Sequence, residues 1–254
     1  MKKAIKKHNK IQQLSLGTLY LIGIACMVLT LFTFISCSSD DSQDSQEPET
    51  VAIPDANFEL VLSNLGYDTN GINGSILKAD AEALTTLDVS NKDINSLQGI
   101  EAFINLTTLY CSGNNLESID ISHNIDLINF KCDDNLLATL NIQNNTNLET
   151  LFCRSNNIES IDTENNLLLE QIDVSNNSLY ILNLSDNSAL TYINAANNQL
   201  NSLCVKNGNN ANFTGFLATS NPNLDCIEVD NETYSNTFWF QFKDAQASYS
   251  EGCL

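Results

Sequence analysis

The sequence predicts a mainly β solenoid, a stack of similar coils with a parallel sheet along one side. The first observation is a fixed step, because five asparagines follow one another at intervals of 21 residues: Asn114, Asn135, Asn156, Asn177 and Asn198. The second is that leucines and other apolar residues recur at the same places around each asparagine. A fixed period of about 20–30 residues with leucines at set offsets marks a solenoid. Such a fold presents an extended surface, which favours binding over catalysis.

Each repeat contains two short alternating segments. In the unit that begins at Leu106, positions 1, 4, 6, 11, 14 and 16 are apolar, and they are Leu106, Leu109, Cys111, Leu116, Ile119 and Ile121. Alternation from position 4 to 6, and again from 14 to 16, predicts one short strand in each half of the unit. Coils stacked about 4.8 Å apart would pair these strands in parallel and bury the apolar columns.

The asparagine at position 9 predicts a structural ladder. It follows the first strand, where the chain must turn and its peptide groups face inward. A buried peptide group without a partner costs about 1–3 kcal/mol. Because an asparagine amide both donates and accepts, a stacked column can satisfy the turns of its own coil and of adjacent coils.

These units resemble the leucine-rich repeat family. The family pattern L-x-x-L-x-L-x-x-N-x-L matches Leu148, Leu151, Cys153, Asn156 and Ile158, and the neighbouring units match it equally. The 21-residue unit is similar to the short repeats frequent in Bacteroidetes surface proteins, and the resemblance covers residues 51–254. It implies a leucine-rich-repeat solenoid with a short helical cap at the N-terminal end and a disulfide-linked cap at the C-terminal end.

The first 36 residues predict export and lipid attachment. Five lysines precede a run from Ile11 to Ser39 that carries no charge, which is the pattern of a secretory signal peptide. The run ends in Phe34-Ile35-Ser36-Cys37, which resembles the lipobox of bacterial lipoproteins and implies that Cys37 carries the lipid. An uncleaved membrane helix is the alternative, since about 20 apolar residues span a bilayer.

Residues 37–50 predict a disordered acidic tether, because their polar composition cannot form a core. Their acidic residues resemble the surface-export signal of Bacteroidetes lipoproteins, although a solubilising spacer explains them equally well. We therefore expect a lipid-anchored protein of the outer membrane or cell surface. Beyond residue 36, six basic residues stand against 31 acidic ones, a net charge of −25. This balance argues against a nucleic-acid partner, whose phosphates need Lys and Arg.

Three parts follow the tether: an N-terminal cap over residues 51–83, the repeats over 84–231 and a C-terminal cap over 232–254. In the first, Asp55 is a candidate helix N-cap, Gly66 a candidate stop, and apolar residues recur between them at helical spacing; these are Phe58, Val61, Leu62 and Leu65. The last contains the single tryptophan, Trp239, and resembles the C-terminal cap of the family. Sugar binding by Trp239 and its neighbours is the alternative.

The cysteines fall into two groups. Cys111, Cys132 and Cys153 share one inward position, which Val174 and Ala195 continue, so we interpret them as buried apolar residues rather than as a metal or redox ladder. Near the C-terminus, Cys226 and Cys253 flank the cap of an exported protein and predict a disulfide. A bond between Cys204 and Cys226 is the competing prediction.

Few residues could take part in catalysis or bind a metal ion, and we predict no enzyme, no cofactor and no metal site. The single histidine beyond the signal peptide, His123, occupies a position that is polar in the other units and predicts a surface residue. The segment Asp68–Gly74 resembles a calcium loop in part, but Ile72 stands where an oxygen ligand belongs. A turn rich in asparagine and glycine is the favoured interpretation.

The outward positions of the first strand predict a partner-binding face. Small polar residues would suffice there, yet the positions include aromatic and basic side chains among acidic ones: Tyr110, Lys131, Phe152, Arg154, Asp173 and Tyr192. Exposed aromatics together with Arg are what interface cores favour. We expect a monomer whose partner is a protein or a glycan, and a structural envelope protein without a specific ligand is the alternative. Ordinary drift of solvent-exposed positions would also explain the pattern.

Overall fold

The computed structural model describes residues 47–253, and residues 46–254 form one compact unit. The predicted signal peptide, the lipidated Cys37 and most of the predicted tether lie outside the described residues. No helix in the described part of the chain has the length and apolar character needed to cross a membrane.

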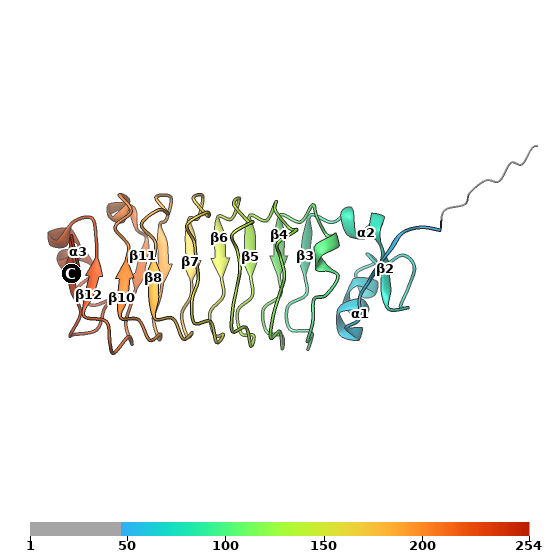
Figure 1. The fold of residues 1–254 in the computed structure, drawn as a ribbon, viewed down its shortest axis with the longest axis horizontal. Helices are drawn as coiled ribbons and strands as arrows, with labels where there is room; N and C mark the ends of the chain where they lie inside the picture. The colour runs from blue at the N-terminus through green and yellow to red at the C-terminus, as the bar shows by residue number, and fades with distance from the viewer. Residues whose placement is uncertain (1–46, 254) are drawn as a thin grey trace, which may run out of the picture. The chain divides into compact units, whose positions relative to one another are not determined.

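A parallel sheet of seven short strands forms one side of the solenoid, in the order β11-β9-β7-β6-β5-β4-β3 (Figure 1). The strands are β3 (Thr86–Asp88), β4 (Thr108–Tyr110), β5 (Asn129–Lys131), β6 (Thr150–Phe152), β7 (Gln171–Asp173), β9 (Tyr192–Asn194) and β11 (Gly215–Leu217). Equivalent residues of successive repeats are paired, for example Leu109 with Phe130 and Phe130 with Leu151. The predicted mainly β solenoid with a parallel sheet is confirmed.

A second parallel sheet exists only toward the C-terminal end, in the order β13-β12-β10-β8. Its strands are β8 (Ile181–Asn183), β10 (Ser202–Cys204), β12 (Cys226–Glu228) and β13 (Ser248–Ser250). The prediction of a strand in the second half of every unit is therefore wrong for the first repeats. There the carbonyl groups of Ile121 and Ile142 accept hydrogen bonds from the side chains of Asn145 and Asn166, so asparagine amides join successive coils on this side.

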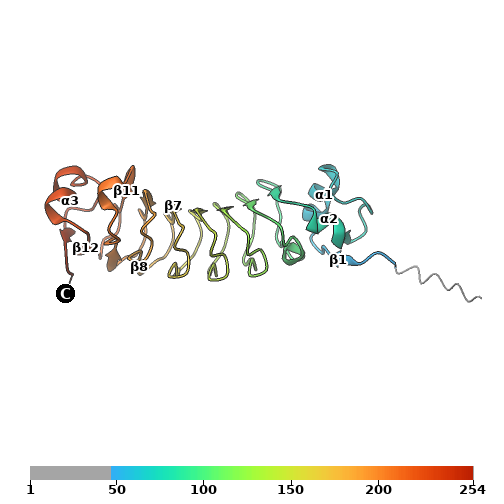
Figure 2. The ribbon, with the colours of Figure 1, turned by 90° about the horizontal axis from the view of Figure 1, so that it is seen from above.

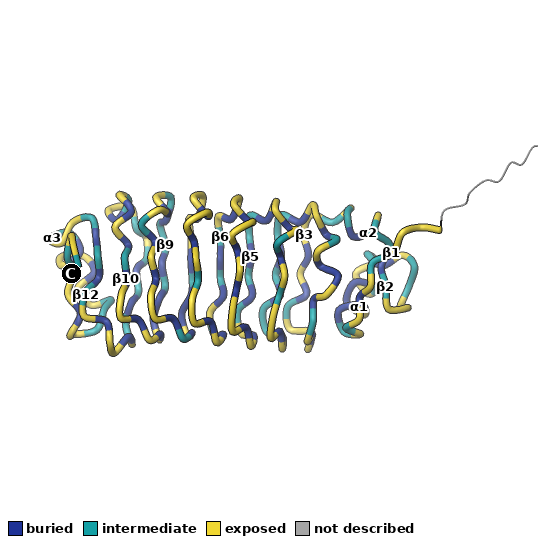
Figure 3. The backbone as a smooth tube through the Cα atoms, viewed as in Figure 1, coloured by how far each residue is buried: buried dark blue, intermediate teal, exposed yellow. Residues whose placement is uncertain are grey.

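Between the two sides, the apolar columns form one continuous core. The middle residue of each strand in the seven-stranded sheet is buried and both of its neighbours are more exposed, as alternation requires. The alternation follows each coil in Figure 3, where the tube changes from buried to exposed within one turn. The core runs unbroken from Phe58 in the N-terminal cap to Tyr249 in the C-terminal cap. Because its ends are covered, we expect residues 46–254 to fold as an independent unit.

The first asparagine column forms a hydrogen-bonded ladder. The side-chain amide of Asn156 donates to the carbonyl oxygens of Cys132 at 3.0 Å and Cys153 at 3.1 Å. Its Oδ1 accepts the N–H of Leu137 at 3.0 Å. The same pattern joins Asn135 and Asn177 to their own coils and to the preceding ones. Each asparagine thus bonds two coils together.

The residue before each of these asparagines has a left-handed backbone. Its φ is +69° at Gly113, +53° at Asp134, +55° at Ser155 and +54° at Asn176. Glycine and asparagine adopt this conformation readily, whereas serine does so at a cost. The turn therefore has one geometry throughout, and the ladder asparagine that follows holds it in place.

A second, shorter column lies at the other turn of the coil and is bonded differently. The Nδ2 group of Asn145 donates to the carbonyl oxygens of Ile121 at 3.0 Å and Asn124 at 2.9 Å. Its Oδ1 is buried and has no hydrogen-bond partner, and the same holds for Asn124 and Asn166. This column therefore donates without accepting, unlike the first one.

The N-terminal cap contains a two-stranded antiparallel sheet and two helices. Its elements are β1 (Thr50–Ala52), α1 (Ala56–Asn64), β2 (Ser75–Leu77) and α2 (Lys78–Glu82), and the short 3₁₀ helix η1 (Ile100–Ala102) follows in the first coil. The predicted helix is present, and Gly66 after it has a φ of +76°. The antiparallel pair and α2 were not predicted.

Asp55 joins this cap to the first coil. Its Oδ1 accepts the N–H groups of Asn57 and Phe58 at the start of α1, which is the predicted N-cap. Its Oδ2 accepts the N–H groups of Asn95 at 2.8 Å and Ser96 at 3.1 Å. Burial acts to raise the pKa of Asp55, but these four bonds together lower it below the ordinary value.

The C-terminal cap covers the last coil with aromatic rings. It comprises α3 (Glu232–Phe238), which lies at the end of the row of coils in Figure 2, and β13, and the 3₁₀ turn η2 (Asn210–Asn212) precedes it in the chain. Trp239 is 5% exposed and stacks on Phe216, with ring centroids 4.6 Å apart. Because its ring is buried, Trp239 itself offers no face to a sugar, whereas its neighbours Phe238 and Phe240 are exposed.

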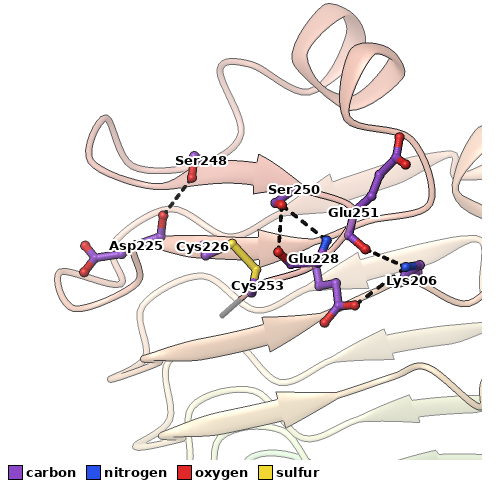
Figure 4. The surroundings of a disulfide bond; sticks show 9 residues. Lys206, Asp225, Cys226, Glu228, Ser248, Ser250, Glu251 and Cys253 are labelled. Atoms are coloured by element: carbon purple, nitrogen blue, oxygen red, sulfur yellow. Dashed lines mark hydrogen bonds and ion pairs between the residues drawn. A yellow bond between two sulfur atoms is a disulfide. The ribbon is translucent and has the colours of Figure 1, made fainter.

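The predicted disulfide between Cys226 and Cys253 is present, with the two Cα atoms 6.0 Å apart (Figure 4). It connects β12 to the segment that follows β13, the strand paired with β12. Cys204 is free and half-buried on β10, opposite Glu228 and therefore diagonal to Cys226. The competing bond between Cys204 and Cys226 is not formed.

Candidate functional site

The outer surface of the seven-stranded sheet carries the candidate partner-binding residues. They are side chains of β4 to β9 at the strand positions that flank the buried centre, and Arg154 lies two residues beyond the end of β6. Tyr110, Lys131, Phe152, Asp173 and Tyr192 are all partly exposed, and Arg154 is exposed. In-register pairing places Tyr110, Lys131, Phe152 and Asp173 in one row across four adjacent strands.

Lys131 lies between two aromatic rings. Its Nζ is 5.1 Å from the ring centroid of Tyr110 and 4.9 Å from that of Phe152. A cation over an aromatic face is attracted by the ring quadrupole, and each contact at an exposed site contributes about 0.5–1 kcal/mol. These contacts hold a long and otherwise mobile side chain in one place. The three residues therefore form an ordered surface feature.

Tyr192 extends this feature by one more ring. Its ring centroid is 6.4 Å from that of Phe152, in a tilted arrangement typical of aromatic pairs. Gly215, its partner on the adjacent strand, makes the placement possible, because a Cβ there would lie 2.7 Å from Cδ2 of Tyr192. We call Tyr110, Lys131, Phe152 and Tyr192 the aromatic ridge. Sequence reasoning missed Gly215, although a glycine at an outward strand position was a visible signal.

Asp173 lies between Phe152 and Asn194 in the same row of strands. Its Oδ1 accepts the N–H of Ser175 at 3.0 Å and the hydroxyl of Ser175 at 2.6 Å. Its Oδ2 accepts the side-chain amide of Asn194 at 3.1 Å. This carboxylate is oriented by its neighbours, and its charge helps to raise the pKa of Tyr192, for which burial is the larger cause.

Arg154 lies beside the ridge and contacts two acidic residues. Its guanidinium forms an ion pair with Asp134 at 3.2 Å, and its backbone N–H donates to Oδ1 of Asp133 at 2.9 Å. Burial raises the pKa of Asp133, and the N–H and charge of Arg154 oppose that shift. Both partners of the ion pair are about half exposed, so it stabilises the fold little and can exchange for a partner's carboxylate. Asp134 was not predicted as part of this face.

The chemistry available on this face is apolar contact, cation–π contact and hydrogen bonding.

His123 is exposed, and the hydroxyl of Ser122 lies 3.3 Å from its Nδ1. Within residues 47–253, no three His, Cys, Asp or Glu side chains are grouped as ligands for a metal ion.

The three cysteines of the predicted apolar column are buried in successive coils. Cys111, Cys132 and Cys153 have no exposed surface, and the thiol of Cys111 donates to the carbonyl oxygen of Lys131 at 3.5 Å. Burial is the main cause of the raised pKa of each of these thiols. They remain protonated at neutral pH and pack as small apolar groups, as expected from the column they share with Val174.

Thiol alkylation should separate these cysteines from Cys204. In the native 46–254 unit we expect iodoacetamide to modify only Cys204 among the four free cysteines, since a buried and protonated thiol does not react. Mass spectrometry of the peptides would measure this, with alkylation in denaturant as the control that all four can react. Native modification of Cys132 at the rate of Cys204 would contradict the buried column.

Together the fold and the face define a class of protein: a parallel β-solenoid of the leucine-rich-repeat type, an architecture that presents an extended surface for binding. No protein-family model matches this sequence, and no curated protein matches it either. The evidence from known proteins therefore comes from solved structures.

Solved structures with this fold include internalins of Listeria monocytogenes. The functional domain of InlJ is 27% identical, with a TM-score of 0.55, and the match covers 72% of this chain and 38% of that one. Internalin InlF is 20% identical, with a TM-score of 0.58 over 78% of this chain and 68% of that one. Internalin C2 is 15% identical, with a TM-score of 0.56 over 80% of this chain and all of that one.

The InlJ domain is described as including a cysteine ladder. This chain spans little more than a third of the InlJ domain, since the match covers 38% of it. The comparison therefore supports the solenoid fold of this chain.

Proposed function

We propose that this chain is a membrane-anchored, surface-exposed leucine-rich-repeat lipoprotein that binds a protein partner and catalyses no reaction. The observation that carries the proposal is the aromatic ridge, an ordered row of exposed rings and one cation on an extended sheet. Aromatic and Arg side chains are enriched at the energetic centres of interfaces. Because the ridge is already ordered, little side-chain entropy would be lost when a partner binds.

A protein partner fits the ridge better than a glycan. Sugar rings stack on open aromatic faces, but the ammonium group of Lys131 lies over the rings of both Tyr110 and Phe152. Ring edges and the half-exposed Arg154 remain available, and these suit the mixed apolar and polar contacts of a protein interface. The acidic residues around them would attract a partner with a basic surface.

Membrane anchoring rests on the sequence. The lipobox-like segment ending at Cys37 would attach the chain to a membrane, and the acidic residues after it would keep the folded unit away from the bilayer surface. A lipid anchor in the outer membrane would present the sheet to partners at the cell surface. Labelling with radioactive palmitate, compared between the wild type and Cys37→Ala, tests this step separately from binding.

The face itself is tested by a double substitution, Phe152→Ala with Arg154→Ala. We expect the 46–254 unit carrying it to lose capture of a partner identified by crosslinking with the wild type, while its melting temperature stays unchanged. Both side chains are partly solvent-exposed, so removing them leaves the core intact. Capture is measured by surface plasmon resonance with the purified partner.

Ile181→Ala is the control, because Ile181 is an exposed apolar residue, at 58%, but belongs to β8 of the other sheet. Retained binding in the double variant would reject the ridge as the binding surface. A wild-type unit that captures no saturable partner would instead favour a structural envelope protein.

A further inference from the structure

The N-terminal cap contains a loop that three carboxylates approach from different elements. Glu59 comes from α1, Asp68 from the loop that follows it, and Asp80 from α2. Asp80 accepts the N–H of Thr69 at 3.1 Å and its hydroxyl at 2.6 Å. Oε1 of Glu59 accepts backbone N–H groups of residues 73, 74 and 75 at the far end of the loop. Two of the three carboxylates therefore already have partners.

Asp68 does not. The residue is 6% exposed, and neither of its carboxylate oxygens has solvent access or a hydrogen-bond partner. Within residues 47–253 it is the only carboxylate in this condition, and none of the ion pairs there involves it. A buried ionised carboxylate without a partner costs several kcal/mol. Its position therefore requires either a proton or a bound cation.

Protonation of Asp68 would leave one of its buried oxygens without a partner. Burial, with the charge of Glu59 as the next cause, raises the pKa of Asp68, and the N–H groups of Gly71 and Asn70 offset part of that shift without reaching hydrogen-bonding geometry. Protonation removes the charge but supplies no donor to the second oxygen. A cation would engage both oxygens and would also be attracted by Glu59 and Asp80.

The donor atoms of this loop specify the class of cation. They are oxygens of carboxylates and of the main chain, since Oδ1 of Asn70 already accepts the N–H of Leu77 at 3.0 Å, and hard divalent ions such as Ca²⁺ prefer oxygen ligands. Calcium also accepts main-chain carbonyls and water, so a site for it does not require the three acidic or thiol ligands that this part of the chain lacks.

We propose that the loop over residues 68–75 binds one calcium ion through the carboxylate of Asp68, beside the carboxylates of Glu59 and Asp80. This proposal is an alternative to the prediction from sequence that the segment is only a turn. The bound ion would fix the loop that leads into β2, the strand paired with β1, and so stabilise the cap over the first coil. Ile72 does not prevent this, because its side chain is 62% exposed and its position can contribute a main-chain oxygen.

The test measures thermal unfolding of the 46–254 unit in chelator and in millimolar calcium. We expect calcium to raise the melting temperature of the wild type and of Asp126→Asn, an exposed residue whose substitution changes the charge identically. In Asp68→Asn the calcium-dependent rise should disappear, while in chelator this variant should be no less stable than the wild type. Absence of a calcium effect in the wild type, or an equal effect in Asp68→Asn, would overturn the proposed site at Asp68.

Terbium luminescence provides a second measurement that does not depend on the folding of Asp68→Asn. Tb³⁺ replaces calcium at oxygen sites and is sensitised by a nearby tyrosine, and Tyr67 immediately precedes Asp68. We expect ultraviolet excitation to give terbium emission that calcium displaces and that Tyr67→Phe removes. Emission that survives in Tyr67→Phe would place the ion elsewhere and refute the site.

Discussion

Asn156→Ala should lower the free energy of unfolding by about 3 kcal/mol, since it leaves the buried N–H of Leu137 without a partner and opens a small cavity. The carbonyl oxygens of Cys132 and Cys153 keep a hydrogen bond in this variant, because Asn135 also donates to Cys132 and Asn177 also donates to Cys153. Chemical denaturation of the 46–254 unit measures the loss. Asn157→Ala is the control, since Asn157 is the exposed neighbour and its only side-chain bond, to Leu136, is long at 3.5 Å.

The second asparagine column provides a sharper comparison. Asn145→Ala should cost only about 1 kcal/mol, because the carbonyls of Ile121 and Asn124 each keep a backbone donor and the Oδ1 of Asn145 has no bond to lose. The two substitutions delete the same atoms from equally buried residues of adjacent coils. Equal losses would show that the accepting half of the first ladder contributes nothing to stability.

Cys253→Ser should destabilise the C-terminal cap by about 3 kcal/mol, the chain-entropy value for a bridge between residues 27 apart. In a solenoid each coil contacts only its neighbours, so the loss should concentrate at that end. The single tryptophan, Trp239, lies inside the bridged segment and reports on it directly. We expect its fluorescence transition in denaturant to precede the circular dichroism transition of the repeats, whereas the two coincide in the wild type.

Cys204→Ser is the control for this experiment, because it removes a free thiol from the adjacent strand and leaves the bridge intact. Its two transitions should stay together. If the fluorescence and circular dichroism transitions of Cys253→Ser coincided at the denaturant concentration of the wild type, the disulfide would not stabilise the cap.

Much of the candidate site could be anticipated from the repeat alone. Register follows from the 21-residue step, so Tyr110, Lys131 and Phe152 were expected in one row, and the structure brings them into contact. The way in which the neighbouring side chains pack against this row could not be anticipated. The position of Tyr192 depends on the missing Cβ of Gly215, and Arg154 turns toward Asp134 at the adjoining turn. Both are contacts between coils, which a single unit does not contain.

The sequence by itself determined the solenoid, its inward columns and its asparagine ladder, because identical units in register can bury their apolar positions in only one way. Only the tertiary structure decided three further points. Sheet pairing on the second side begins only at β8. The strand β13 brings Cys253 rather than Cys204 to Cys226. The packing of the N-terminal cap leaves Asp68 buried and unpaired. The last two depend on residues outside the regular units, where periodicity no longer specifies which groups meet.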